Sequence, residues 1–150
     1  MYPKQHIIFG FLFSLIIFLI FPQIEWIGFT AIFLSSFLID VDHYLVYVIK
    51  EKDWNLKNAY NWYIESEKKS QSLSLKEQRN PPSHLFVLHG IEILVLIVFF
   101  GIFISKLFLF IFVGFSFHLF LDAIHIYFLR FNHNRFSLIY SYIKFRKQKV

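Results

Sequence analysis

The sequence contains no cysteine, which excludes disulfide bonds, thiolate zinc sites and iron–sulfur clusters. Strong metal ligands can therefore come only from histidine and carboxylate side chains. Acidic residues are also few, because 10 Asp and Glu stand against 15 Lys and Arg, for a net charge of +5. The 5 glycines form neither a phosphate-binding loop nor a dinucleotide-binding pattern, and no serine lies in a nucleophile elbow.

Apolar residues dominate what is present. They make up 57% of the 150 residues, and 22 residues are Phe, which is more than the core of a soluble domain requires. Several apolar runs approach or exceed the length of a membrane span. The first run, 7–21, lacks a cleavage site after it and is interpreted as a retained span, not a signal peptide. The sequence thus predicts an integral membrane protein with a single transmembrane domain over residues 1–150.

The apolar runs predict an all-α membrane protein, a four-transmembrane-helix bundle made of two antiparallel hairpins. The expected spans are about 6–21, 24–49, 84–105 and 106–129, and the very short links favour antiparallel neighbours. A loop over 50–83 and a tail over 130–150 remain outside the spans. Within the loop, 54–64 has the spacing of an interfacial helix, and 65–80 is expected to be mobile. A second interfacial segment is expected at 135–150, where a basic cluster favours anionic lipid.

Basic residues indicate the orientation. Fourteen Lys and Arg lie before the first span, in the 50–83 loop or after the fourth span, and only Lys106 lies on the other side. The positive-inside rule therefore predicts an integral protein of the cell (inner) membrane with both termini and the 50–83 loop in the cytoplasm.

The most unusual stretch is 114–125, which reads GFSFHLFLDAIH. His118, Asp122 and His125 recur there at i, i+4 and i+7, so a helix presents all three on one face. Ionisable groups within a membrane-length apolar run are costly and usually mark a functional site. A His and a carboxylate one turn apart suit a divalent metal ion, whereas the alternative is a His–Asp hydrogen bond that only joins two helices.

Every predicted span carries ionisable residues toward its cytoplasmic end. The set is His6, Asp40, Asp42, His43, His84, His89, Glu92, His118, Asp122 and His125. Counted from the outer turns, one residue of each span lies 15 or 16 positions in, which places it about 24 Å from the outer face. These four residues, His6, Asp40, His89 and Asp122, are therefore expected at one level, as in bundles that hold metals between facing helices.

Spacing restricts which residues can act together. Asp40 and His43 share a helical face, whereas Asp42 points elsewhere on a regular helix. Either the helix is irregular at 39–43, or one Asp supports a ligand. Asp42 and His43 are candidates for a second metal ion or for the base that activates water, and Glu92 and His125 for groups that orient ligating histidines. The candidate metal ligands are His6, Asp40, Asp42, His43, His84, His89, His118 and Asp122; the candidate catalytic residues are Asp42, His43 and Glu92.

These motifs resemble the predicted membrane-bound metal-dependent hydrolases, the YdjM-like inner-membrane group. The early His6, the D-x-D-H at 40–43, the five-residue separation of His84 and His89, and Gly114, His118 and Asp122 in a G-x-x-x-H-x-x-x-D pattern carry the resemblance. It implies a small helical membrane protein with a metal-dependent hydrolase site. The chain departs from the family pattern at Leu85, where the family has Arg, and at Leu88 and Gly90, where Ser or Thr is usual.

Residues and resemblance together predict a hydrolase that activates water with one or two divalent ions, zinc first and manganese or another ion second. A site near the headgroup level favours a lipid-like ester or phosphoester as substrate; membrane lipid, and no nucleic acid, is the expected partner. One alternative is a metal-handling or transport protein, although the outer halves of the spans contain almost no polar groups. The other is a structural protein whose His and Asp residues only bond helices together.

Overall fold

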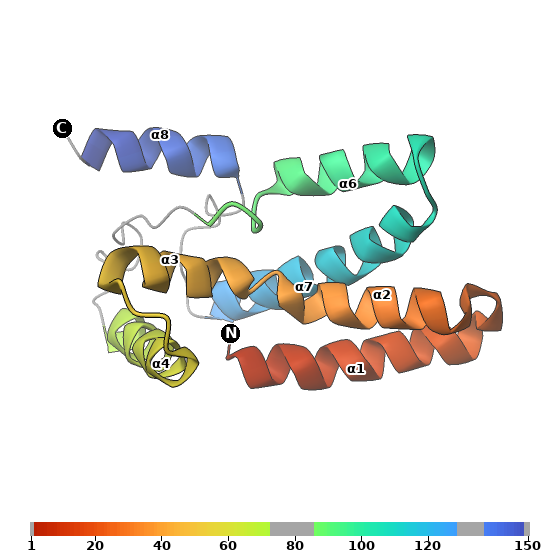
Figure 1. Ribbon diagram of the computed structural model, residues 1–150, viewed down its shortest axis with the longest axis horizontal. Coiled ribbons are helices and arrows are strands. Elements are labelled where there is room, and N and C mark those ends of the chain that lie inside the picture. Colours follow the sequence, from red (N-terminus) through yellow and green to blue (C-terminus); the bar gives the residue numbers. More distant parts are fainter. Residues whose placement is uncertain (1, 73–85, 129–136, 149–150) are drawn as a thin grey trace. The chain divides into compact units, whose positions relative to one another are not determined.

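The computed structural model describes residues 2–72, 86–128 and 137–148, and every regular element within those ranges is a helix (Figure 1). The α-helices are α1 (Pro3–Ile20), α2 (Glu25–Leu38), α3 (Val41–Glu51), α4 (Leu56–Ser72), α6 (Ile91–Phe103), α7 (Leu107–Phe128) and α8 (Leu138–Gln148). The chain divides into two compact units, Met1–Ile39 with Ile91–Ala123 and Asp40–Gly90 with Ile124–Val150.

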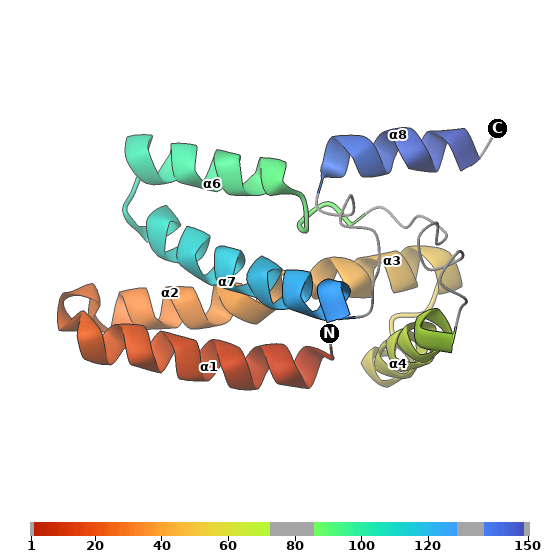
Figure 2. The same ribbon diagram turned by 180° about the vertical axis from the view of Figure 1, so that it is seen from behind.

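In the first unit, α1 and α2 form an antiparallel hairpin. The backbone N–H of Tyr2 donates to Gln5 Oε1 at 3.1 Å, and Pro3 occupies the first helical position, where a missing N–H costs nothing. A short 3-10 turn, Pro22–Ile24, joins the two helices because proline cannot continue α1. The helices then lie side by side along their length (Figures 1 and 2). The expected first hairpin is therefore present.

Small residues allow the helices of this unit to approach closely. A Cβ atom on Gly10 would overlap the Ser36 hydroxyl, and one on Gly114 of α7 would overlap the backbone oxygen of Ile32. The hydroxyls of Ser14, Ser35 and Ser36 donate to carbonyls of their own helices, so they add no unpaired polar group to the contact. Small residues at crossings replace the hydrophobic driving force that is absent between helices in lipid.

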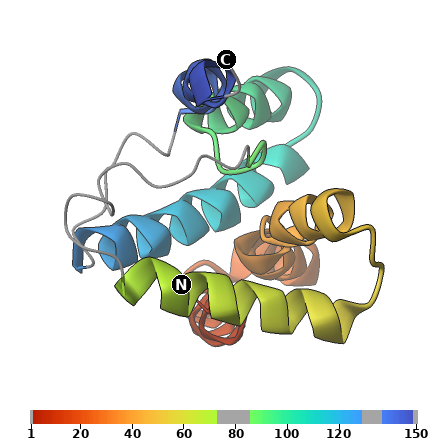
Figure 3. The same cartoon turned by 90° about the vertical axis from the view of Figure 1, so that its left-hand side faces the viewer.

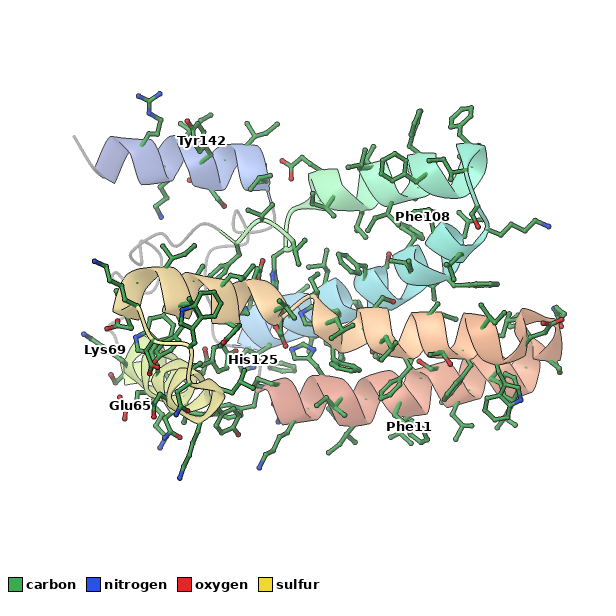
Figure 4. All side chains as sticks on the ribbon, in the orientation of Figure 1. Phe11, Glu65, Lys69, Phe108, His125 and Tyr142 are labelled. Atoms are coloured by element: carbon green, nitrogen blue, oxygen red, sulfur yellow. The ribbon has the colours of Figure 1, made fainter. Side chains whose placement is uncertain are left out.

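Aromatic rings fill the rest of the first unit. Phe11 meets Phe29 edge to face, with ring centroids 6.1 Å apart, and Phe13 stacks on Phe117 of α7 at 3.9 Å (Phe11 is labelled in Figure 4). Outward-facing apolar side chains remain exposed, among them Leu19 at 68% and Ile102 at 67%. Such an apolar exterior suits lipid and not water.

Three helical stretches of the described chain are long and apolar enough to cross a membrane: Pro3–Ile20, Pro22–Glu51 and Leu107–Phe128. They match the predicted first, second and fourth spans within a few residues. The third prediction, 84–105, is matched only in part, because α6 has 13 residues and is about 20 Å long, shorter than a hydrocarbon core. The first part of that prediction, 84–85, lies outside the described residues.

The second unit is built on the packing of α3 and α4 (Figure 3). Tyr47 and Val48 of α3 bury against Ala59 of α4, with Trp62 beside them. The corner between the helices is held by Asp53, which accepts hydrogen bonds from the Tyr47 hydroxyl at 2.5 Å and the Asn58 amide at 2.8 Å. These hydrogen bonds lower the pKa of the Asp53 carboxyl below its ordinary value.

Helix α4 is longer than the sequence indicated. An interfacial helix was expected at 54–64 and a mobile segment after it, but the helix continues to Ser72. Asn55 caps its start by accepting the backbone N–H of Lys57 at 2.9 Å, and Gln71 donates to Glu67 one turn away at 3.2 Å. The helical prediction was therefore too short, because a polar composition is compatible with a capped helix, and the mobility of the segment stays a prediction. Residues 73–80 lie outside the described ranges.

We expect Gly114→Ala to destabilise the protein by about 1–3 kcal/mol, because the new methyl group overlaps a backbone oxygen that cannot rotate away. Gly101→Ala is the comparison: its methyl group would meet mainly the Leu109 side chain, at Cδ2 and Cγ, which can move more readily than a backbone oxygen, and alanine favours the helix, so a smaller loss is expected. Thermal unfolding in detergent should show the larger loss for Gly114→Ala. Equal effects would contradict the proposed close approach of α2 and α7.

Candidate metal centres

Three of the predicted ligands meet in the first unit, where His6 of α1 lies beside His118 and Asp122 of α7. One ligand atom from each lies within 4.8 Å of the others. His6 Nε2 is 3.2 Å from Asp122 Oδ1, and His118 Nε2 is 3.3 Å from Asp122 Oδ2. The two imidazole rings stack with centroids 4.0 Å apart and are almost inaccessible, at 1% and 0% exposure. We call this trio the buried group.

The hydrogen bond from His118 to Ser36 determines which ring nitrogen of His118 carries the proton. Its Nδ1 lies 2.9 Å from the Ser36 carbonyl oxygen, which can only accept, so Nδ1 carries the proton. In the neutral ring, Nε2 then has a lone pair that faces the Asp122 carboxylate. A lone pair and a carboxylate oxygen at that distance repel unless a cation lies between them. The geometry therefore calls for a shared cation, either a second proton on the ring or a metal ion.

The distances help to distinguish these two cations. A charge-assisted N–H···O bond is usually about 2.7–2.9 Å long, shorter than either His–Asp distance in the buried group. Two ligands of one tetrahedral zinc-like ion, each about 2.1 Å from it, are about 3.4 Å apart. Neither ring nitrogen of His6 makes an aligned hydrogen bond with a described residue, although Asp122 is within reach. The three side chains could hold a divalent ion, and both His–Asp distances are also within hydrogen-bond reach.

A second trio lies in the other unit and consists of Asp40, His43 and His89. Asp40 Oδ1 is 3.6 Å from His43 Nε2 and 3.7 Å from His89 Nε2. The three candidate ligand atoms again lie within 4.8 Å of one another. The rings of Tyr63 and Phe86 pack against His43, which remains 22% exposed. We call this trio the α3 group; it is more open than the buried group.

The helix is interrupted beside the α3 group. Helix α2 ends at Leu38 and α3 starts at Val41, so Asp40 does not follow the regular positions of α3. The ring of His89 reaches both carboxylates, with Nε2 toward Asp40 and Nδ1 3.1 Å from Asp42 Oδ2. Of the two explanations left open by the spacing, irregularity at 39–43 is thus present.

Asp42 occupies a supporting position. Its Oδ2 also accepts the Leu88 backbone N–H at 3.0 Å, so that one oxygen fixes both the loop at 88–89 and the ring of His89. A carboxylate that accepts from Nδ1–H holds the ring so that Nε2 can ligate a metal. Asp42 Oδ1 is buried and has no hydrogen-bond partner among the described residues. The sequence predicted Asp42 as both a metal ligand and a base, but Asp42 belongs to neither trio.

The other predicted site residues lie elsewhere. His84 falls outside the described residues. Glu92, a candidate to orient a ligating histidine, is in the first turn of α6, whereas His89 precedes that helix. His125, predicted to orient a ligand, instead places Nε2 2.8 Å from Glu67 Oε1 of α4 (His125 is labelled in Figure 4).

The Glu67 carboxyl is largely buried by this contact. Burial by itself raises the pKa of Glu67, but the hydrogen bond from His125, assisted by one from Gln71, more than offsets it and leaves the pKa below the ordinary value. Glu67 is therefore ionised around neutral pH and holds the end of α7 to α4. Both of these segments belong to the second unit.

Sequence reasoning missed three partners of the candidate sites: the Ser36 carbonyl, the Leu88 N–H and Glu67. The first two are backbone groups, which no residue type reveals. A signal for Ser36 was available, because Ser35 and Ser36 form a pair of small residues in a span that had to meet other helices. Glu67 lay in a segment interpreted as mobile, so no partner was sought for it.

Comparisons of the chain with models of known families, with curated proteins and with solved structures gave no match. The resemblance to membrane-bound metal-dependent hydrolases therefore stays a prediction that depends on the quoted motifs. The arrangement of the two trios comes from the chain's own geometry.

We expect the Glu67–His125 pair to stabilise the protein only while Glu67 is ionised. Since folding lowers the pKa of Glu67, its contribution is present above the unfolded-state pKa and is lost as pH falls through the folded-state value. A double-mutant cycle with Glu67→Gln and His125→Ala should give a coupling of about 1 kcal/mol at neutral pH. Thermal unfolding at neutral and acidic pH measures it. A coupling that persists unchanged in acid would contradict the ionised pair.

Proposed function

We propose that the protein is a membrane-embedded, metal-dependent hydrolase whose buried group, His6, His118 and Asp122, holds a divalent ion. The observation that carries the proposal is the requirement for a cation between His118 Nε2 and Asp122, because Nδ1 already donates to Ser36. Two imidazoles and one carboxylate are a ligand set typical of zinc, and manganese is the next candidate.

A site with three protein ligands also leaves one coordination position of the ion open. Structural zinc sites are usually closed by four protein ligands, whereas catalytic sites have three and keep one position for water or substrate. When bound, a divalent ion at such a site lowers the pKa of water toward about 7 and polarises an ester or phosphoester oxygen. The chain's own contribution is to fix the ligands: Ser36 sets the ring of His118, and stacking on His118 sets the ring of His6.

The α3 group is proposed as a second metal site, which accounts for the expectation of one or two ions. Asp42 Oδ2 orients His89 through its Nδ1, and Asp42 Oδ1 has no hydrogen-bond partner among the described residues. We assign Asp42 Oδ1 as the proton acceptor in the α3 group, because a carboxylate oxygen without a hydrogen bond keeps its lone pairs free to take a proton. His43, the most exposed of the trio, is positioned to contact substrate.

We also propose an orientation of the protein in the membrane and a class of substrate. We propose that α6 is the fourth crossing, together with the non-helical segment 86–90 that precedes it, and that both termini and the 50–83 loop lie in the cytoplasm, as the basic residues indicate. The ligands then lie in the cytoplasmic halves of their spans, where an amphiphile exposes its headgroup linkage. A lipid-like ester or phosphoester is therefore the substrate class that we favour.

Metal content tests the ligand assignment. Protein purified without added metal should contain at least one divalent ion per chain by elemental analysis, and His118→Ala should remove one equivalent. His125→Ala is the matched control, since that histidine pairs with Glu67 and should leave metal content unchanged. Folded wild-type protein that holds no metal after incubation with zinc or manganese would reject the metal site and leave the structural alternative.

Catalysis needs a separate test. We expect Asp42→Asn to retain metal, because its amide oxygen still accepts a hydrogen bond, and to lower the hydrolysis rate about 10²–10⁴-fold through loss of the proton acceptor. The measurement is turnover of fluorogenic lipid-like esters and phosphoesters by the protein in vesicles, with and without a chelator. Metal-loaded protein that hydrolyses none of these and moves metal ions across the vesicle would favour the transport alternative.

A further inference from the structure

Helix α8 presents an apolar face whose side chains are largely exposed. At 100° per residue, Leu138, Tyr142, Ile139 and Ile143 occupy one arc of about 140° that also includes Arg146, whereas Tyr140, Ser141 and Lys144 lie on the remaining side. Ile139, Tyr142 and Ile143 are 62%, 50% and 49% exposed (Tyr142 is labelled on α8 in Figure 4). A row of exposed apolar side chains indicates a surface with a partner.

Charge indicates what that partner is. Residues 129–150 contain six basic side chains and no Asp or Glu: Arg130, Arg135, Lys144, Arg146, Lys147 and Lys149. The partner is therefore anionic as well as apolar. Nucleic acid satisfies the charge but leaves the Ile139 face in water, and a second copy of α8 covers that face but brings together like charges. An anionic lipid bilayer satisfies both requirements.

Attachment to a membrane span favours the same partner. The candidate span α7 ends at Phe128, and α8 begins at Leu138, after nine intervening residues. Nine residues extend at most about 32 Å, so α8 is tethered within reach of the bilayer surface. The effective concentration of lipid around α8 is consequently high, and even a modest affinity is sufficient for docking.

We propose that α8 is an anionic-lipid-binding helix that lies in the bilayer interface with Ile139, Tyr142 and Ile143 toward the acyl chains. Arg146, at the C-terminal end of the apolar face, and Lys144, on the polar side, contact lipid phosphates, because long basic side chains can extend to the headgroups. The interaction concerns the tail alone and does not depend on metal or on hydrolysis.

The lack of cysteine permits a direct test, because a single introduced thiol labels one position. Full-length Ile143→Cys carrying an environment-sensitive fluorophore is placed in nanodiscs of phosphatidylcholine, with or without phosphatidylglycerol. The label should shift to a shielded, blue-shifted state and be quenched by spin-labelled lipid when phosphatidylglycerol is present. Removing two charges, in K144Q/R146Q, should lower the bound-to-free ratio roughly thirtyfold. Added salt should act in the same direction.

Ser141→Cys is the matched control, because position 141 lies on the polar side and its label should stay in water in every lipid. A label at position 143 that is equally shielded in both lipid mixtures and in detergent, and unaffected by salt or K144Q/R146Q, would show that α8 packs on protein and would overturn the proposal. Exposure of the same label to water in phosphatidylglycerol nanodiscs would also overturn it.

Discussion

The close approach of α2 and α7 at Gly114 is the constraint on which the candidate chemistry depends. Gly114 and His118 are one helical turn apart on the same face of α7, so the contact that admits α2 at Gly114 also brings the ring of His118 to the Ser36 carbonyl. A larger residue at 114 would separate the helices, and the hydrogen bond that fixes the His118 tautomer would be lost. A packing detail in the apolar part of the helix thus determines which nitrogen faces Asp122.

Both trios bring imidazole and carboxylate groups together, but their surroundings differ. Burying an uncompensated charge in an apolar bundle is costly, so the buried group needs a cation matched to its carboxylate and imidazoles. Its rings stack on each other, and the His118 ring is fixed by a hydrogen bond to the neighbouring helix α2. In the α3 group, Asp40 and His89 meet beside a break in the helix, and the rings of Tyr63 and Phe86 pack against His43, which stays partly exposed. The buried group is thus the more rigid trio, and the α3 group is the more accessible one.

Outside the trios, the second unit is stabilised by polar contacts at helix ends. Asp53 holds the corner between α3 and α4, and Glu67 holds α4 to the end of α7 through His125. Both carboxyls have a lowered pKa because hydrogen bonds favour their ionised forms. These contacts explain why a segment as polar as 65–72 is an ordered helix.

The sequence by itself determined the helical class, the candidate spans and six of the residues that meet in the two trios. The length of an apolar run predicts a span because a segment must be long enough to cross the bilayer. The count inward from the outer turns predicted His6 level with Asp122 and Asp40 level with His89, and the residues of each pair do meet. Periodicity could not predict the break at Ile39–Asp40, the role of Asp42 or the Ser36 and Leu88 backbone partners, nor that α6 is short. Only the tertiary structure decided these, because they depend on how closely helices approach and on which backbone groups are left free, and neither is encoded in the identity of any one residue.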